Sequence, residues 1–346
     1  MTQIPDSYFI PSSYSRIVAR ELGLHERDLP RLLRGTGLST DILLPGDETR
    51  LSGRQQLRII DNGQRMLEAP EFGLRLGRQL NPTAHGPLGY LALSSPDLIT
   101  ALESLRDFLP ARLALVGIDV ALGEDWLCCS LDIKVQADHD ERRVLQECFA
   151  LVIQSFTESI LGRELTDARI ELAHDEPDYR RVYPHYLHSP VIFACPVNSF
   201  LIPAGLARVP NNSGDSDSYA MAQALCMKLL EQVPAAALST GDRVRRLLLS
   251  KTPGSVTEEE VARAMFISKR TLARRLEAEG DSYRRIREKL LSELAGRHLR
   301  ESGLTVEAVA ALLGYSDTAA FRKAFHRWYG QSPSEFRAGA VTAGEP

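Results

Sequence analysis

Two similar stretches near the C-terminus decide the fold: VTEEEVARAMFISKRTLARRLEAEG at Val256–Gly280 and LTVEAVAALLGYSDTAAFRKAFHRWYG at Leu304–Gly330. Each contains a Val-Ala pair, then a serine, then two large apolar residues, at nearly the same spacing. The second stretch has one additional residue before its first phenylalanine and one more before its final glycine. Self-similarity of this kind indicates two copies of one structural unit.

Both copies have the pattern of a helix, a tight turn and a second helix. In the first copy, Thr257 and Glu260 form a T-x-x-E capping box that predicts a helix start. Ser268 is the expected N-cap of the helix that follows. In the second copy, Thr305 and Ser316 are the expected caps. The sequence therefore predicts two helix-turn-helix units.

The second helix of each unit is amphipathic. Leu272 and Leu276 in the first unit, and their counterparts Phe321 and Phe325 in the second, are spaced to face a core. The residues expected to point outward are largely basic: Lys269, Arg270, Arg274, Arg275, Arg322 and Lys323. Helix-turn-helix proteins place this helix in the DNA major groove, where arginine and lysine pair with guanine edges.

A continuous amphipathic helix is predicted between the two units, from Ser282 to Ser302. About 21 residues at 1.5 Å each span roughly 30 Å, which is close to one turn of B-DNA, about 34 Å. This length predicts that the two outer helices can enter successive major grooves of one duplex. A final capping box, Ser332 to Glu335 with proline at the first helical position, predicts one more short helix.

The charge distribution agrees with a nucleic-acid partner at this end of the chain. The net charge of the 346 residues is −4. Residues 242–346 hold 19 Lys and Arg against 14 Asp and Glu, whereas the other 241 residues carry a balance of −9. A basic segment on an acidic body points to a polyanion. The alternative is a helical bundle whose arginines are solvated or contact another protein.

One string in this region resembles a known signature. GYSDTAAFRKAFHRWYGQSPSEFR, Gly314 to Arg337, is similar to the signature of the AraC/XylS family of bacterial transcription regulators. The resemblance covers about 243–337. More loosely, the N-terminal half resembles the arabinose-binding-like effector domain of some members, through FGLRLG at Phe72–Gly77, the segment Gly86–Leu105 and the segment His174–Phe193.

The resemblance implies a ligand-responsive, often dimeric activator or repressor in the cytoplasm, which binds double-stranded promoter DNA and contacts RNA polymerase. It implies an unknown small-molecule effector. No stretch of the sequence approaches 18 uninterrupted apolar residues, so we expect no membrane span. We also expect no cofactor and no metal. The resemblance also implies the positions that read bases: Arg270, Ala273, Arg274, Thr318, Ala319, Arg322 and Lys323. The alanines among them offer only apolar contact, for instance to a thymine methyl group.

The N-terminal part predicts an α+β domain, so the chain is expected to have two domains. We expect residues 1–233 to form the effector-binding and dimerisation domain, 234–241 a linker, and 242–340 the all-α DNA-binding domain. The alternating pattern of residues 127–135 is typical of a half-buried strand. The other elements expected are helices at 52–67, 141–162 and 218–233, a helix capped by Ser95, strands at 113–122, 168–173, 191–195 and 198–202, and a polar loop at 210–218.

The helix at 218–233 is also a candidate dimer contact. Its apolar stripe is expected to contain Ala222, Leu225, Leu229 and Val233. Packing within its own domain is the ordinary role of such a stripe, so both interpretations stay open at this point.

Three other kinds of function have weaker support. His174, His185, His188 and Cys195 fall within a short segment, but their spacing matches no zinc pattern. The vicinal pair Cys128–Cys129 suggests redox sensing, although Cys129 has the parity of a core position. No GxGxxG, P-loop or GxSxG motif is present, so we expect no enzyme activity.

Overall fold

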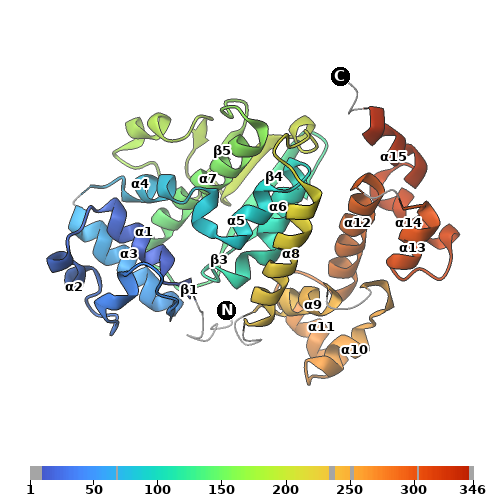
Figure 1. The fold of residues 1–346 in the computed structure, drawn as a ribbon, viewed down its shortest axis with the longest axis horizontal. Coiled ribbons are helices and arrows are strands. Elements are labelled where there is room, and N and C mark those ends of the chain that lie inside the picture. The colour runs from blue at the N-terminus through green and yellow to red at the C-terminus, as the bar shows by residue number, and fades with distance from the viewer. Residues whose placement is uncertain (1–9, 68, 234–237, 250–252, 302–303, 343–346) are drawn as a thin grey trace. The chain divides into compact units, whose positions relative to one another are not determined.

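The computed structural model describes residues 10–67, 69–233, 238–249, 253–301 and 304–342, and the chain divides into two compact units at Ala237/Leu238 (Figure 1). The first unit combines helices with a small sheet. Its α-helices are α1 (Ser13–Glu21), α2 (Leu29–Leu32), α3 (Gly53–Leu67), α4 (Phe72–Gln79), α5 (Pro87–Leu93), α6 (Leu98–Phe108), α7 (His139–Leu161) and α8 (Ser216–Glu231).

Seven strands and six short 3-10 helices complete the described part of the first unit. The strands are β1 (Ile10–Pro11), β2 (Arg50–Leu51), β3 (Val116–Leu122), β4 (Trp126–Ile133), β5 (Arg169–Glu171), β6 (Val191–Ile192) and β7 (Ser199–Pro203). The 3-10 helices are η1 (Glu26–Asp28), η2 (Thr40–Leu43), η3 (Pro82–His85), η4 (Leu109–Ala111), η5 (Arg180–His185) and η6 (Ala204–Leu206). The α+β class expected for this part of the chain is confirmed.

The central sheet has five strands in the order β3-β4-β7-β5-β6. β4 is the strand that the alternating pattern predicts, and it pairs with β3 as an antiparallel hairpin joined through the turn at Gly123–Asp125. Cys129 pairs with Val120 on one side and Phe200 on the other, and it is fully buried. β3, β5 and β6 are each up to three residues shorter at one or both ends than expected.

The long helix α7 is the main core element behind this sheet. It starts at a capping box made by Asp138 and Glu141 and ends at Gly162, whose left-handed conformation stops the helix. Its length and hydropathy would suit a membrane span, yet 72% of its most apolar 18-residue window is buried within the protein. It packs against α6, β4 and α4 (Figure 1), so α7 is a core helix.

Two glycines let α4 approach α7 closely. A Cβ atom on Gly73 would lie 2.1 Å from a carboxylate oxygen of Glu147, and one on Gly77 would lie 2.7 Å from Leu151 Cδ1. The glycine spacing of FGLRLG is therefore a packing requirement of this helix pair.

Two expectations about helices in this unit are wrong in detail. The helix expected after Ser95 begins at Leu98, and Asp97 is its cap, accepting a 2.9 Å hydrogen bond from Thr100 N. Ser95 is fully buried, and its hydroxyl donates to Leu91 O instead. An aspartate in extended conformation satisfies the free N–H group better than a serine placed two residues earlier.

The stripe expected on α8 is shifted by one position along much of the helix. Its buried residues are Tyr219, Ala222, Cys226 and Leu230. Leu225 is 46% exposed. Asp215 caps the helix, which starts at Ser216, inside the expected polar loop. α8 therefore buries one apolar face in its own domain and shows a second one to its surroundings.

The second unit is wholly helical within its described residues. Its elements are α9 (Thr240–Leu249), η8 (Pro253–Ser255), α10 (Glu258–Ala264), α11 (Lys269–Ala278), α12 (Tyr283–Glu301), α13 (Val306–Leu312), α14 (Thr318–Tyr329) and α15 (Pro333–Thr342). α9 begins inside the segment expected to be linker, of which 234–237 lie outside the described residues. Ser239 accepts from Asp242 N, and the carboxylate of Glu279 accepts from the N–H groups of Thr240 and Gly241.

A buried acid links α7 to the segment that contains η5. Glu147 on α7 is fully buried and accepts hydrogen bonds of 2.7 and 2.6 Å from the hydroxyls of Tyr179 and Tyr183. Burial raises the pKa of Glu147 to about 7 from an ordinary value of 4.5, despite these hydrogen bonds.

This pKa predicts a pH-dependent stability. Between pH 4.5 and 7 the unfolded chain releases the Glu147 proton while the folded chain retains it, so stability falls as pH rises. We expect Glu147→Gln to remove up to roughly 3 kcal/mol of this pH dependence. Urea unfolding at pH 5 and pH 7.5 measures it. The control is Glu176→Gln, which removes an exposed carboxylate and should leave the change of unfolding free energy with pH as in the wild type. The same change with pH in wild type and Glu147→Gln would contradict the prediction.

Candidate nucleic-acid interface

The first helix-turn-helix unit consists of α10 and α11. Both hydrogen bonds of the predicted capping box are present: the side chains of Thr257 and Glu260 each accept from the other residue's backbone N–H. Ser268 caps α11 by accepting from Thr271 N at 3.1 Å. Leu272 and Leu276 are fully buried in the core of this unit, as their spacing predicts.

The second helix-turn-helix unit consists of α13 and α14, and the second helix of this pair begins one residue later than expected. Thr305 caps α13 as predicted, but Asp317 rather than Ser316 caps α14, accepting from Ala320 N at 2.7 Å. The cap-to-core spacing is then four residues in both units, from Ser268 to Leu272 and from Asp317 to Phe321. The additional residue of the second copy therefore lies in the turn and leaves the helix register unchanged.

The predicted DNA-contacting residues form the outer surfaces of α11 and α14. Those that are exposed are Lys269, Arg270, Ala273, Arg274, Arg275, Ala319, Arg322 and Lys323, and Thr318 is half-buried. On the opposite side of each helix, the two core residues are fully buried. Each helix thus presents a face that no part of its own unit covers.

Each unit also holds one basic residue of this face in an ion pair. Lys269 Nζ lies 3.3 Å from Glu258, and a guanidinium nitrogen of Arg322 lies 3.4 Å from Glu307. Both acids belong to the first helix of the same unit. Exposed pairs of this kind contribute little to stability, so both cations remain available to a stronger anion.

Helix α12 carries the cores of both units. Leu290 packs into the first core, Leu291 and Ala295 into the second, and Leu294 contacts both. Its 19 residues correspond to about 28 Å of helix. Ser282 caps it by accepting from Arg285 N, so the helix begins as predicted; residue 302, its expected end, lies outside the described residues.

A second connection, between the two helix-turn-helix units, was not expected from the sequence. Arg287 on α12 donates a 2.8 Å hydrogen bond to Gly254 O in η8. A Cβ atom on Gly254 would lie 1.9 Å from Leu313 O, at the turn of the second unit. The segment that precedes the first unit therefore packs on the turn of the second. The glycine of Pro253-Gly254 is the sequence signal for this close approach.

Similarity to known proteins agrees with this geometry. A family model described as the arabinose-binding domain of AraC transcription regulators, N-terminal, matches residues 27–211, more than half of the chain. A helix-turn-helix domain model matches residues 261–339. The chain belongs to the AraC family of transcription regulators. It is a DNA-binding regulator with an arabinose-binding-like N-terminal domain.

Several relatives of this AraC-family chain are named as regulators. The ornithine utilization regulator of Pseudomonas aeruginosa is 28% identical over 315 residues, covering 85% of this chain and 86% of that protein. The HTH-type transcriptional regulator VqsM of the same species is 46% identical over 76 residues, 22% of this chain and 23% of VqsM. The crystal structure of the regulator CdpR from P. aeruginosa covers 94% of this chain and 98% of its own, with 24% identity and a TM-score of 0.47.

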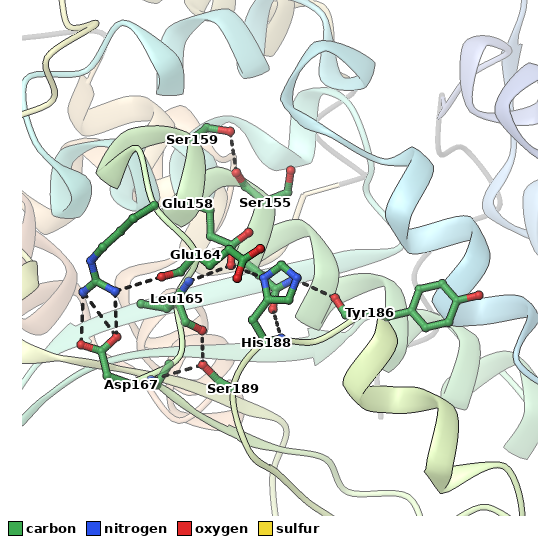
Figure 2. Close-up of polar contacts among 12 residues, drawn as sticks. Ser155, Glu158, Ser159, Glu164, Leu165, Asp167, Tyr186, His188 and Ser189 are labelled. Carbon is green, nitrogen blue, oxygen red and sulfur yellow. Dashed lines mark hydrogen bonds and ion pairs between the residues drawn. The ribbon is translucent and has the colours of Figure 1, made fainter.

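Two of the three histidines considered for a metal site, His174 and His188, have other partners in this AraC-family structure. His188 Nδ1 lies 2.6 Å from Glu158, and its backbone N–H donates to Gln154 (Figure 2). His174 Nδ1 is bonded to Asp175 O, and its ring lies beside Tyr183. No group of three or more potential ligands occurs among the described residues. These contacts are those of framework residues.

The vicinal cysteines lie on opposite faces of β4. Cys129 is fully buried, and burial raises the pKa of its thiol; Cys128 is half-buried, and burial raises its pKa as well. A raised pKa disfavours the reactive thiolate. The geometry gives no support to redox sensing at this pair.

One residue of the first helix-turn-helix unit has a strained backbone conformation. Phe266, in the turn between α10 and α11, has a φ of +56° and is 96% exposed. The equivalent turn position of the second unit is Gly314, with a φ of +81°. A left-handed conformation costs about 1–2 kcal/mol for residues other than glycine, and the exposed ring gains no burial in return.

The strain predicts a stabilising substitution. We expect Phe266→Gly to raise the free energy of unfolding by up to about 1 kcal/mol, because the relief of strain exceeds the added entropy of an unfolded glycine. Urea unfolding of the full chain measures this. Phe266→Ala is the matched control, since it removes the ring and keeps the strain. A Phe266→Gly variant less stable than Phe266→Ala would contradict this explanation.

Proposed function

We propose that this protein is a sequence-specific transcription regulator in which α11 and α14 enter successive major grooves of promoter DNA. One observation supports this above all. Two capped helices, α11 and α14, have exposed, mainly basic faces, and their buried faces belong to two cores to which the same 19-residue helix, α12, contributes. The length of α12, about 28 Å, is close to the 34 Å turn of B-DNA. The rival function, a helical bundle for protein contacts, gives no reason for that spacing.

The side chains assigned to base reading are Arg270, Ala273 and Arg274 in α11, and Thr318, Ala319, Arg322 and Lys323 in α14. Lys269 and Arg275 flank them and are assigned to DNA contact as well. Arginine and lysine recognise guanine through its O6 and N7 atoms, whereas the alanines leave room for a thymine methyl group. Specificity then comes from few polar contacts, with the remaining basic side chains adding phosphate contacts.

Substitution of single arginines tests the DNA interface. We expect Arg274→Ala and Arg322→Ala each to weaken binding to the operator by about 1–3 kcal/mol and to relax base preference at the position read. Gel shift with the full chain and a set of single-base operator variants measures both effects.

The matched control is Arg27→Ala, which removes an exposed arginine from the N-terminal unit, far in sequence from α11 and α14. This substitution changes the net charge by the same amount as the other two. It should bind DNA with unchanged affinity and preference. If both Arg274→Ala and Arg322→Ala kept full affinity and unchanged preference, the proposed interface would be wrong, and the bundle would be better explained as a protein-binding surface.

We further propose that the N-terminal unit, Met1–Ala237, senses a small-molecule effector and that the protein forms a cytoplasmic homodimer through it. Effector control requires that the ligand bind two states of the regulator with different affinity. Family resemblance supports an RNA polymerase contact and activation. For the dimer, Met221 and Leu225 on α8 support a contact surface, since they are 66% and 46% exposed and lie one helical turn apart.

The dimer contact can be tested on α8. We expect Leu225→Glu to shift the protein from dimer to monomer in analytical ultracentrifugation, because the charge would be buried in an apolar contact. Val197→Glu, which places the same charge at another exposed apolar position of this unit, should leave the dimer unchanged. A dimer that persists at the wild-type dissociation constant in Leu225→Glu would exclude this surface.

A further inference from the structure

Within the part of the chain that the structure describes, two connections hold the helix-turn-helix units together. One is α12, which contributes side chains to both cores. The other consists of residues 253–256, which contain η8 and form what we call the η8 segment. This segment leads directly into Thr257, the N-cap of α10. A displacement of the η8 segment therefore moves the first helix-turn-helix unit.

The η8 segment packs on both helix-turn-helix units. At one end, Val256 is buried in the core of the first unit. At the other end, a Cβ atom on Gly254 would lie 1.9 Å from Leu313 O, in the turn of the second unit. A Cβ atom on Gly314, in the same turn, would lie 3.0 Å from Ser255 N. The backbones of the η8 segment and of this turn are therefore in direct contact, with no room for a side chain between them.

Two side chains of α12 hold the η8 segment in this place. Tyr283 and Arg287 are four residues apart, so their side chains lie on the same face of α12, one turn apart. The Tyr283 hydroxyl donates a hydrogen bond to Val256 O. The Arg287 guanidinium donates one of 2.8 Å to Gly254 O. Because a charged donor makes the stronger hydrogen bond, Arg287 is the firmer of these two attachments.

Arg287 is also close to side chains of both helix-turn-helix units. Tyr283 packs against the core of the first unit, and Tyr315 packs against the core of the second. Burial raises the pKa of each tyrosine, and the positive charge of Arg287 opposes this rise at both. The guanidinium is therefore within electrostatic range of both cores, at the place where the two units meet.

We propose that Arg287 is a positioning residue that sets which operator spacing the protein accepts, by holding the η8 segment against both helix-turn-helix units. This proposal rests on the proposed function, in which α11 and α14 enter successive major grooves. A single connection would let the units twist about α12, whereas two connections close a ring that resists this motion. One base pair added between the two DNA sites moves one of them by about 3.4 Å along the duplex and by about 35° around it. To follow that change the η8 segment has to leave Arg287.

The test measures how strongly DNA binding by the full chain depends on operator spacing. The wild type selects an operator from a library of random duplexes, and two further duplexes have one base pair inserted or deleted at its centre. Gel shift gives the spacing ratio, which is the Kd for an altered duplex divided by the Kd for the selected one. For the wild type we expect a ratio of at least about 10, because the base contacts of one unit are lost. For Arg287→Met we expect a ratio at least about threefold smaller, because this variant has no hydrogen bond to Gly254 to break.

The matched control is Arg284→Met, which makes the same change at a side chain of α12 that is 81% exposed, and it should keep the wild-type ratio. Circular dichroism checks that each variant is folded. If Arg287→Met does not fold, Tyr283→Phe takes its place, since it removes the hydrogen bond to Val256 and should also lower the ratio. A folded variant that loses affinity by the same factor on all three duplexes keeps the wild-type ratio and overturns the proposal. A wild type that binds all three duplexes equally contradicts the proposed two-groove function, and the role of Arg287 with it.

Discussion

The arrangement of the DNA-binding unit depends on the burial of two apolar cores along one helix. Leu290 and Leu291 are neighbours in α12, yet they face different cores, and Leu294 contacts both. Because adjacent residues on a helix point about 100° apart, the two units are rotated about α12 as well as displaced along it. The distance and the angle between α11 and α14 are therefore fixed by the same few buried side chains. The contact of Gly254 with the turn at Leu313 restricts that angle further.

The capping residues show how far local sequence signals determine this region. Thr257, Ser268 and Thr305 each cap the helix that their position predicts, because a serine or threonine in extended conformation reaches the N–H group three residues on. At Ser316 and Asp317 two good caps are adjacent, and sequence alone does not decide between them. The buried Phe321 does, since its fit in the core fixes the helix register, and Asp317 is the residue that stands four positions before it.

Prediction was less successful where packing partners come from distant parts of the chain. The hairpin of β3 and β4 and the long α7 follow from local periodicity. The buried face of α8 does not, because Leu225 and Leu230 are equally apolar, and only the position of α5 against α8 decides which is covered. A small apolar cavity in the N-terminal unit, lined by residues such as Ile60, Leu131 and Val152, is still less accessible to sequence reasoning. It consists of space that many apolar side chains leave unfilled, and no single residue among them signals it.

The two ion pairs on α11 and α14 bear on the proposed DNA binding more than on stability. Lys269 and Arg322 are more than half exposed, so each pair with Glu258 or Glu307 adds little to folding. On arbitrary DNA, such a cation gains only a phosphate contact, against which the nearby carboxylate competes by attraction and by repelling the phosphate. In the proposed interface, Arg322 also gains a base contact at a correct operator, whereas Lys269 gains a DNA contact beside the base-reading side chains. The carboxylates therefore lower the affinity for any DNA, and the base contact of Arg322 supplies the difference in binding free energy between operator and arbitrary sequence. In this way a modest net positive charge is compatible with selective recognition.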